Sequence, residues 1–388
     1  MKMNTYARLS HAVARFSPCR GLIIGLACLL FLPGTTPVPA TASPPATIVF
    51  RTETVDNHLR GNSAMVMGKD AFPQIAYEAN GPTSAELNYA RWTGSWWSMQ
   101  SVANMDFGGA ANLAVDANSD PHISFSACNM WYCQPRFADW TGSEWVITST
   151  IEGSGPIAID AANMPHMAYA YGNVAGSVSL RHAYRLNNQW ITTTLDSGLD
   201  DLPASVAIAL NSQGYPQIAY YARGALNYTA WLGDSWTTQV VETQRNVGLA
   251  VALALDGADQ PHLSYYDWVR GDLRHATRTA TGWITETVDS GGDVGGITSL
   301  AIDRQDHPHI AYYDATQRRI KYARWSGSQW QIFVVDTAIG GGLPISLGLD
   351  AQDLPRIAYP YWDGVSANSS LKLAGGEWAH YFPMILRS

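Results

Sequence analysis

The sequence lacks the features by which most enzymes and nucleic-acid-binding proteins are identified. It contains no HExxH, no GxSxG, no P-loop and no dinucleotide-binding fingerprint, so it offers no recognisable zinc-protease, α/β-hydrolase or nucleotide site. Charged residues make up only 14% of the chain, with 24 Lys+Arg against 32 Asp+Glu. The formal net charge of −8 argues against nucleic acid or an anionic membrane surface as a partner, because both require a basic surface.

Hydrophobic runs are short, and the run near the N-terminus predicts a secretion signal. Gly21–Leu32 is apolar but only about a dozen residues long, which is short for a membrane span. Basic residues precede it, and Ala40-Thr41-Ala42 places small residues where a signal peptidase cleaves. We therefore expect residues 1–42 to be a signal peptide cleaved near Ala42, giving a secreted or cell-surface protein without stable membrane insertion. An uncleaved anchor is the alternative. The basic residues in this segment are Lys2, Arg8, Arg15 and Arg20.

Cysteine is scarce. Of four cysteines, Cys19 and Cys28 belong to the expected signal peptide, which leaves Cys128 and Cys133. Two close cysteines in an oxidising compartment predict a disulfide, and no further ligands nearby suggest a zinc site. Cleavage would also remove four basic and no acidic residues, which takes the net charge from −8 to −12. We expect no metal and no cofactor.

One phrase, typified by Pro308-His309-Ile310-Ala311-Tyr312, occurs seven times. Its prolines are 48, 44, 51, 45, 47 and 47 residues apart, a period typical of solenoids, propellers and arrays. We number the copies repeats 1 to 7. Their phrases begin at Pro73, Pro121, Pro165, Pro216, Pro261, Pro308 and Pro355.

Repeat 6 shows how one unit is built. Short alternating or apolar segments predict four strands, separated by turn residues. No segment after residue 42 has sustained helical periodicity, so we expect an all-β protein. Four strands joined by hairpins make one blade of a β-propeller, and seven repeats predict seven blades in residues 43–388. The expected strands of repeat 6 are 299–303, 309–314, 320–325 and 330–336.

The two ends of the chain predict how the ring closes. Thr52–Asp56 reads TETVD, which is identical to Thr285–Asp289, the fourth strand of repeat 5. The N-terminal segment therefore resembles a fourth strand without its first three, and the last repeat supplies those three. Pairing them would close the ring and remove both open edges. The short C-terminal tail, 379–388, is the alternative fourth strand, although Pro383 would interrupt its ladder.

Several recurring side chains suggest chemistry, but the repeat explains each of them. His122, His166, His262 and His309 share one position, which Gln74, Gln217 and Arg356 fill elsewhere, so we expect a turn brace in place of a metal ring. The turn acids of the repeats suit Asx turns better than calcium loops. Asp289-Ser290-Gly291-Gly292 resembles a serine-protease motif, but it lies in a segment that recurs at the same position in other repeats, so we interpret it as part of the repeat.

The loops that differ between repeats are the better candidates for function. In a propeller, the loops after the second and fourth strands share one face, and loops on a rigid scaffold often bind ligands. Aromatic rings beside carboxylates suit carbohydrate, because rings stack on sugar faces and polar groups bind hydroxyls. The alternative for the Tyr-Tyr-Asp segments is packing against the next blade. The candidate ligand-binding residues are Trp131, Tyr132, Tyr171, Tyr266, Asp267, Trp268, Tyr313, Asp314, Tyr361, Trp362 and Asp363.

The PHIAYYD-type strand, the WTGSxW-type hairpin and the period resemble secreted bacterial β-propellers of the sialidase-like and fucose-lectin-like kind, over residues 47–378. No Ser-x-Asp-x-Gly-x-Thr-Trp box is present and no arginine triad can be assigned, so catalytic residues stay unknown. The lectin resemblance implies sugar sites between or on top of blades.

These observations favour a non-enzymatic propeller that binds glycans or proteins through its loop face. A glycoside hydrolase or lyase with acids near the central channel is the main alternative, and a structural envelope or adhesion module is another. An axial pocket with two close carboxylates would indicate the hydrolase. Shallow aromatic pockets repeated between blades would indicate the lectin.

Overall fold

In the computed structural model, every regular element among the described residues is a β-strand. The structure describes residues 47–81, 84–106, 109–128, 132–149, 152–172, 177–199, 205–337, 344–362, 364 and 369–379. All of them belong to the second of two units into which the chain divides, Ala46–Ser388. No helix in this part of the chain has the length and apolar character needed to cross a membrane.

Each repeat forms an antiparallel sheet, and repeats 3 to 6 form four separate four-stranded sheets. This confirms the all-β class and the four-strand unit. Their strands are β9 (Ile157–Ile159), β10 (Pro165–Gly172), β11 (Val178–Leu186) and β12 (Gln189–Leu199); β13 (Val206–Leu210), β14 (Pro216–Ala222), β15 (Ala225–Trp231) and β16 (Trp236–Glu242); β17 (Val247–Leu255), β18 (Pro261–Asp267), β19 (Asp272–Thr279) and β20 (Gly282–Asp289); β21 (Val294–Ile302), β22 (Pro308–Asp314), β23 (Arg319–Trp325) and β24 (Trp330–Thr337).

The other three repeats are linked by hydrogen bonds into one longer path. A single parallel pair, Asp106 with Cys128, joins repeat 1 to repeat 2. Their strands are β1 (Ile48–Met67), β2 (Pro73–Asn80), β3 (Ala85–Trp92) and β4 (Trp97–Asp106); β5 (Ala111–Val115), β6 (Pro121–Cys128), β7 (Cys133–Trp140) and β8 (Trp145–Ser149); β25 (Ser346–Leu349), β26 (Pro355–Tyr361) and β27 (Ser369–Trp378).

The long strand β1 belongs to two sheets. Its first half pairs with β27 from Ile48 to Leu59, and its second half pairs with β2 as far as Met67. The N-terminal segment thus serves as the fourth strand of repeat 7 and then as the first strand of repeat 1. The backbone amide of Ala379 donates to Thr47 O at 2.8 Å, which extends this pairing. The remainder of the tail, 380–388, lies outside the described residues.

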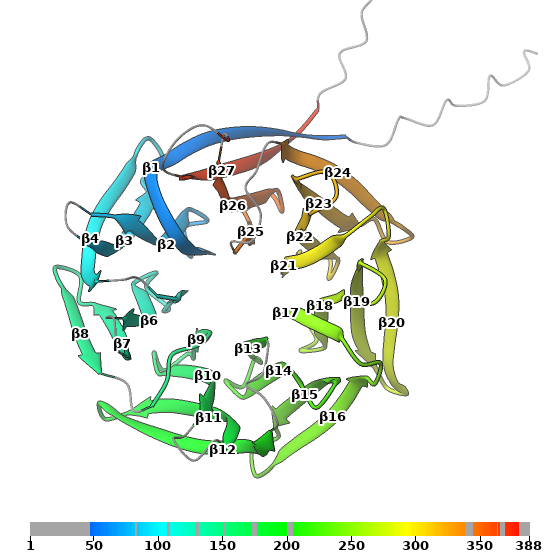
Figure 1. Ribbon diagram of the computed structural model, residues 1–388, viewed down its shortest axis with the longest axis horizontal. Helices are drawn as coiled ribbons and strands as arrows, with labels where there is room; N and C mark the ends of the chain where they lie inside the picture. Colours follow the sequence, from blue (N-terminus) through cyan, green and yellow to red (C-terminus); the bar gives the residue numbers. More distant parts are fainter. Residues whose placement is uncertain are drawn as a thin grey trace, which may run out of the picture. The chain divides into compact units, whose positions relative to one another are not determined.

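The sheets follow one another around a common centre, with the first strands innermost (Figure 1). Each first strand contacts the next, and β25 contacts β1. The second strands are the most buried, as their continuous apolar phrase requires, and hydrophobic clusters fill the space between neighbouring sheets. The sequential inner contacts are β1–β5, β5–β9, β9–β13, β13–β17, β17–β21, β21–β25 and β25–β1.

An aromatic contact recurs between consecutive sheets. A third-strand ring of one repeat lies 5.2 to 5.4 Å from the first tryptophan of the next repeat's fourth strand. Phe50 in β1 takes the place of that tryptophan for repeat 7, and its ring centroid lies 5.7 Å from that of Tyr322. The five pairs with tryptophan are Tyr89–Trp145, Phe137–Trp190, His182–Trp236, Tyr228–Trp283 and His275–Trp330.

The turn between the first and second strands is built by its acid. Asp303 Oδ1 accepts hydrogen bonds from the amides of Gln305 and His307, both at 2.8 Å. His309, in the following strand, lies with Nε2 3.2 Å from Asp303 Oδ2. In repeat 6 the shared histidine thus braces the turn, whereas in repeats 2, 3 and 5 the equivalent histidine bonds a side chain of the third strand. The same pair of backbone bonds is made by Asp116, Asp160, Asn211, Asp256 and Asp350.

Candidate functional site

The predicted loop residues of repeat 5 lie together but mostly contact one another. The Tyr266 hydroxyl donates to Asp293 Oδ1 at 2.5 Å, and Asp267 is fully buried, where it accepts from the amides of Val269 and Arg270. Trp268 packs edge-to-face against Tyr266 and is 64% exposed. Only the tryptophan of this group therefore offers free surface to a ligand.

The candidates in the other repeats are dispersed over several sheets, and most are engaged within the protein. The guanidinium of Arg181 lies 3.9 Å from the ring centre of Tyr171, and the ammonium of Lys372 lies 3.3 Å from that of Tyr361. Asp314 is fully buried beside Lys321, at 3.2 Å. Tyr313 packs against the hydrophobic cluster of repeats 6 and 7.

Exposed aromatic side chains on these loops belong to separate repeats. Tyr132 in repeat 2 is 55% exposed beside the predicted disulfide, which is present between Cys128 and Cys133. Trp362 in repeat 7 is 38% exposed. Trp131 and Asp363 lie outside the described residues.

Three cavities lie elsewhere, in crevices between consecutive sheets at the end where first strands turn into second strands. None of the described loop candidates lines any of the three. We name them by the repeats that form them. The 7/1 crevice has a volume of about 530 Å³, the 1/2 crevice about 410 Å³ and the 3/4 crevice about 560 Å³.

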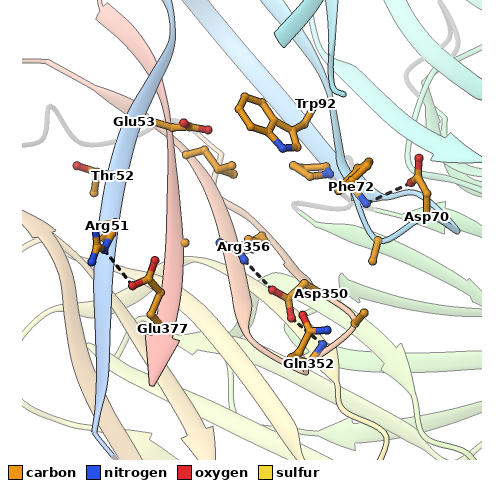
Figure 2. Close-up of a pocket in the computed structure, with 15 residues that line it drawn as sticks. Arg51, Thr52, Glu53, Asp70, Phe72, Trp92, Asp350, Gln352, Arg356 and Glu377 are labelled. Carbon is orange, nitrogen blue, oxygen red and sulfur yellow. Dashed lines mark hydrogen bonds and ion pairs between the residues drawn. The ribbon is translucent and has the colours of Figure 1, made fainter. Parts of the chain in front are cut away.

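The 7/1 crevice combines an aromatic wall with charged side chains (Figure 2). Trp92 and Phe72 come from repeat 1, and Arg356 lies across from them, where it donates to Asp350 Oδ2 at 2.7 Å. Gly375 leaves the room that Arg356 occupies, because a Cβ there would collide with the guanidinium. The crevice is thus open at a position where other repeats place a side chain.

Charged residues from the paired strands β1 and β27 complete the 7/1 crevice. Arg51 Nε lies 2.9 Å from Glu377 Oε2 in an exposed ion pair (Figure 2). Glu53 accepts a hydrogen bond from Trp97 Nε1 at 3.1 Å. The crevice therefore presents carboxylates and guanidiniums side by side with two aromatic rings.

The 1/2 crevice is continuous with the 7/1 crevice through shared residues. Asp70, Phe72 and Trp92 line both, so the turn and hairpin of repeat 1 separate two adjoining cavities. Its far wall is Trp140 of repeat 2. Arg91 donates to Asp70 Oδ2 at 2.7 Å. Burial raises the pKa of Asp70, but the hydrogen bond and charge of Arg91 together with the backbone amide of Phe72 outweigh burial and hold this pKa below its usual value.

The 3/4 crevice has the same plan with different side chains. Its far wall is Trp231, the equivalent of Trp140, and Tyr184 takes the place of Arg91. His166, His182, Tyr215 and Trp236 add further rings, and Asp160 is its single acid.

Each of the three crevices is lined by a tryptophan at the end of a third strand. Where arginine replaces this tryptophan in repeat 3, the space between the sheets is filled. In repeat 3 that position is Arg185, whose guanidinium binds Asp139 of repeat 2 through two bonds of 2.6 and 2.8 Å. His122 also binds this carboxylate at 2.7 Å. The 2/3 junction is therefore occupied by the protein's own ion pair. Sequence analysis treated the tryptophans only as part of the hairpin motif and missed the signal given by their replacement with Arg185.

Comparisons with known proteins identify the fold only. No protein-family model matches the sequence, and no curated protein matches it in sequence. An ulvan lyase of a new polysaccharide lyase family, bound to GlcA(1-4)Rha3S, is similar in structure with a TM-score of 0.57 and 10% identity, over 83% of this chain and 95% of that one. Polysaccharide lyase Uly1 has a TM-score of 0.54 and 10% identity, over 81% and 89%.

A mutant of the Aleuria aurantia lectin in complex with Fucα1-6GlcNAc is similar at a TM-score of 0.47 and 15% identity, over 74% of this chain and 99% of that one. The likeness to the two polysaccharide lyases shows a propeller-like fold and nothing of this chain's activity.

Proposed function

We propose that this protein is a secreted, closed seven-bladed propeller that binds glycans without turning them over. The proposal rests mainly on the two adjoining crevices around repeat 1, because Phe72 and Trp92 line both of them. Ring closure is supported by the double pairing of β1 and by the unbroken series of contacts between first strands.

The side chains around repeat 1 have the composition that sugars require. Aromatic faces pack against the C–H face of a pyranose, while carboxylate, amide and guanidinium groups bond its hydroxyls. Trp92 lies between the two cavities, and Gln100 and Gln352 supply amides, one in each cavity. An oligosaccharide lying across repeat 1 would place successive units in the two crevices.

The state of Asp70, the acid that lines both crevices, supports binding over hydrolysis. A general acid for glycoside cleavage needs a raised pKa. Asp70 has a lowered pKa and is held by Arg91, and Asp350 is held by Arg356 and by two backbone amides. Asp70 is therefore not poised to protonate a leaving oxygen.

Binding of the protein, expressed without residues 1–42, to a glycan array tests this proposal. Trp92→Ala should abolish binding to the best glycan, since it removes the ring shared by both crevices. Trp268→Ala is the matched control, because it removes an exposed tryptophan from the opposite, loop end. Loss of binding in Trp268→Ala alone would move the site to the loop face.

Turnover is tested on the same glycans. Release of reducing ends would indicate a hydrolase, and the ultraviolet absorbance of a newly formed C=C bond would indicate a lyase. Either result would overturn the non-enzymatic assignment. Secretion is tested separately, by mass spectrometry of the protein in the culture medium, where we expect a chain that starts after Ala42.

A further inference from the structure

The 3/4 crevice differs from the crevices around repeat 1 in its chemistry. Among the described residues that line it there is no lysine or arginine, whereas the 1/2 crevice contains Arg91 and the 7/1 crevice contains Arg51 and Arg356. Half of its twelve described lining residues are aromatic. The aromatic lining residues are His166, His182, Tyr184, Tyr215, Trp231 and Trp236.

These rings come from two sheets and support one another. Tyr184 of repeat 3 stacks on His182 and His166, with ring centroids 6.1 and 5.9 Å apart. Across the crevice, Trp231 packs on Trp236 at 5.7 Å. The cavity is therefore bounded by aromatic groups from both sides.

The only formal charge among the described lining residues is negative. Asp160 is mostly buried, and its Oδ1 accepts from the amides of Ala162 and Met164. Burial lowers the pKa of His182 to about 3 and also lowers that of His166, so both imidazoles are neutral near pH 7. An aromatic cavity with one carboxylate and no cation attracts positive charge.

We propose that the 3/4 crevice binds a small organic cation that carries a quaternary or methylated ammonium group. Aromatic faces favour such a cation because its charge is diffuse and weakly hydrated, and the methyl groups contact the rings directly. Asp160 supplies the complementary charge. This site is independent of the glycan site at repeat 1, since the two share no lining residue.

Choline is the probe, and isothermal titration calorimetry of the protein without residues 1–42 is the measurement. The control ligand is dimethylbutanol, in which a quaternary carbon replaces the nitrogen and removes the charge without changing the shape. We expect choline to bind at least about tenfold more tightly than this isostere, the difference that a desolvated cation–π contact provides. Equal affinities would show a merely apolar cavity and overturn the proposal.

The test variants introduce residues that the same fold already holds at the same position in other repeats. Tyr184→Arg introduces the residue found at this position in repeats 1 and 6, and Trp231→Arg introduces the residue found in repeats 3 and 5. Both should abolish choline binding, because each places a guanidinium in the crevice. Trp140→Arg makes the matched change in the 1/2 crevice and should leave choline binding unaltered.

Three results would each refute the site. They are full choline binding by Tyr184→Arg, displacement of choline by methyl glycosides, and loss of choline binding in Trp140→Arg.

Discussion

The hydroxyl of Tyr312 donates a hydrogen bond of 2.7 Å to Asp289 Oδ2 and so joins repeat 6 to repeat 5. Asp289 ends the fourth strand β20, and Tyr312 lies in the buried second strand β22 of the next sheet. Lys321 Nζ binds the same oxygen at 2.7 Å. A carboxylate at the edge of one sheet is thus held by a phenol and an ammonium of its neighbour.

The same bond recurs at three other junctions, so it belongs to the design of the repeat. The equivalent pairs are Tyr77–Asp56 at 2.7 Å, Tyr220–Asp196 at 3.1 Å and Tyr359–Asp336 at 2.8 Å. Between repeats 1 and 2 both partners are changed, since Phe125 replaces the tyrosine and Ala103 replaces the acid. This junction therefore has neither the donor nor the acceptor of the bond.

Replacement of Tyr312 by phenylalanine tests how much this bond stabilises the fold. We expect Tyr312→Phe to lower the free energy of unfolding by about 1–2 kcal/mol, because a buried bond to a charged acceptor is lost while Lys321 still neutralises Asp289. Urea denaturation followed by tryptophan fluorescence gives this quantity. Tyr265→Phe is the control, since that buried hydroxyl makes no hydrogen bond to a carboxylate. A larger cost for the control than for Tyr312→Phe would contradict the role assigned to the bond.

The proposed closure of the ring by β1 leads to a second prediction. Phe50 is partly buried against Tyr322 and fills the place that tryptophan has in other repeats, so Phe50→Ala should destabilise the protein by about 2 kcal/mol. Phe50→Trp should restore or increase the stability. Val49→Ala, on the same strand but 44% exposed, should be nearly neutral. Thermal unfolding by calorimetry distinguishes these variants, and equal effects of Phe50→Ala and Val49→Ala would contradict closure through this strand.

The buried histidines predict sensitivity to acid. The pKa of His182 falls from 6.5 to about 3 in the folded protein because of burial, whereas an unfolded histidine keeps its ordinary value. Below pH 6.5 the unfolded chain therefore binds more protons, and stability decreases as the pH falls toward 3. This site contributes up to about 1.4 kcal/mol per pH unit in that window.

Substitution of His182 by tyrosine isolates this contribution. Tyrosine occupies the position in repeats 1, 4 and 6, and His309 pairs with Tyr322 there in repeat 6. We expect the stability of His182→Tyr to fall less steeply with decreasing pH than that of the parent protein. Urea denaturation at intervals of about one pH unit between about pH 7 and about pH 4 measures this difference. Parallel curves for the two proteins would refute the assignment.

The sequence was sufficient for the fold because the fold is periodic. Comparing seven copies separates what every sheet requires, such as the turn acid of Asp303 or the strand phrase at Pro308, from what one sheet has alone. The identity of Thr52–Asp56 with Thr285–Asp289 even located the displaced strand, since strand chemistry is the same wherever the strand lies in the chain.

The crevices could not be found in this way, because each is formed by two repeats. Tyr184 and Trp231 are 47 residues apart, and only the packing of one sheet on the next brings them to one cavity. The predicted loop residues do not form one site, because several of them bond to groups of their own loop. Asp267 and Asp314 resemble ligand-binding acids in sequence, but short loops need acceptors for their own amides, and these acids fill that need.

The filled 2/3 junction gives the last prediction. Burial raises the pKa of Asp139, but the hydrogen bonds from His122 and Arg185 outweigh it and hold this pKa below its usual value. Arg185→Ala removes the bidentate partner from a carboxylate that is mostly buried, so we expect a loss of about 2–3 kcal/mol in the free energy of unfolding at pH 7. The loss should shrink as the pH falls below the higher pKa that Asp139 has in this variant, since a protonated Asp139 needs no cation.

Arg51→Ala is the control. It breaks the exposed pair with Glu377 and should cost less than about 0.5 kcal/mol. Urea denaturation of both variants checks this, and equal costs would show that the Arg185 pair contributes no more than a surface contact.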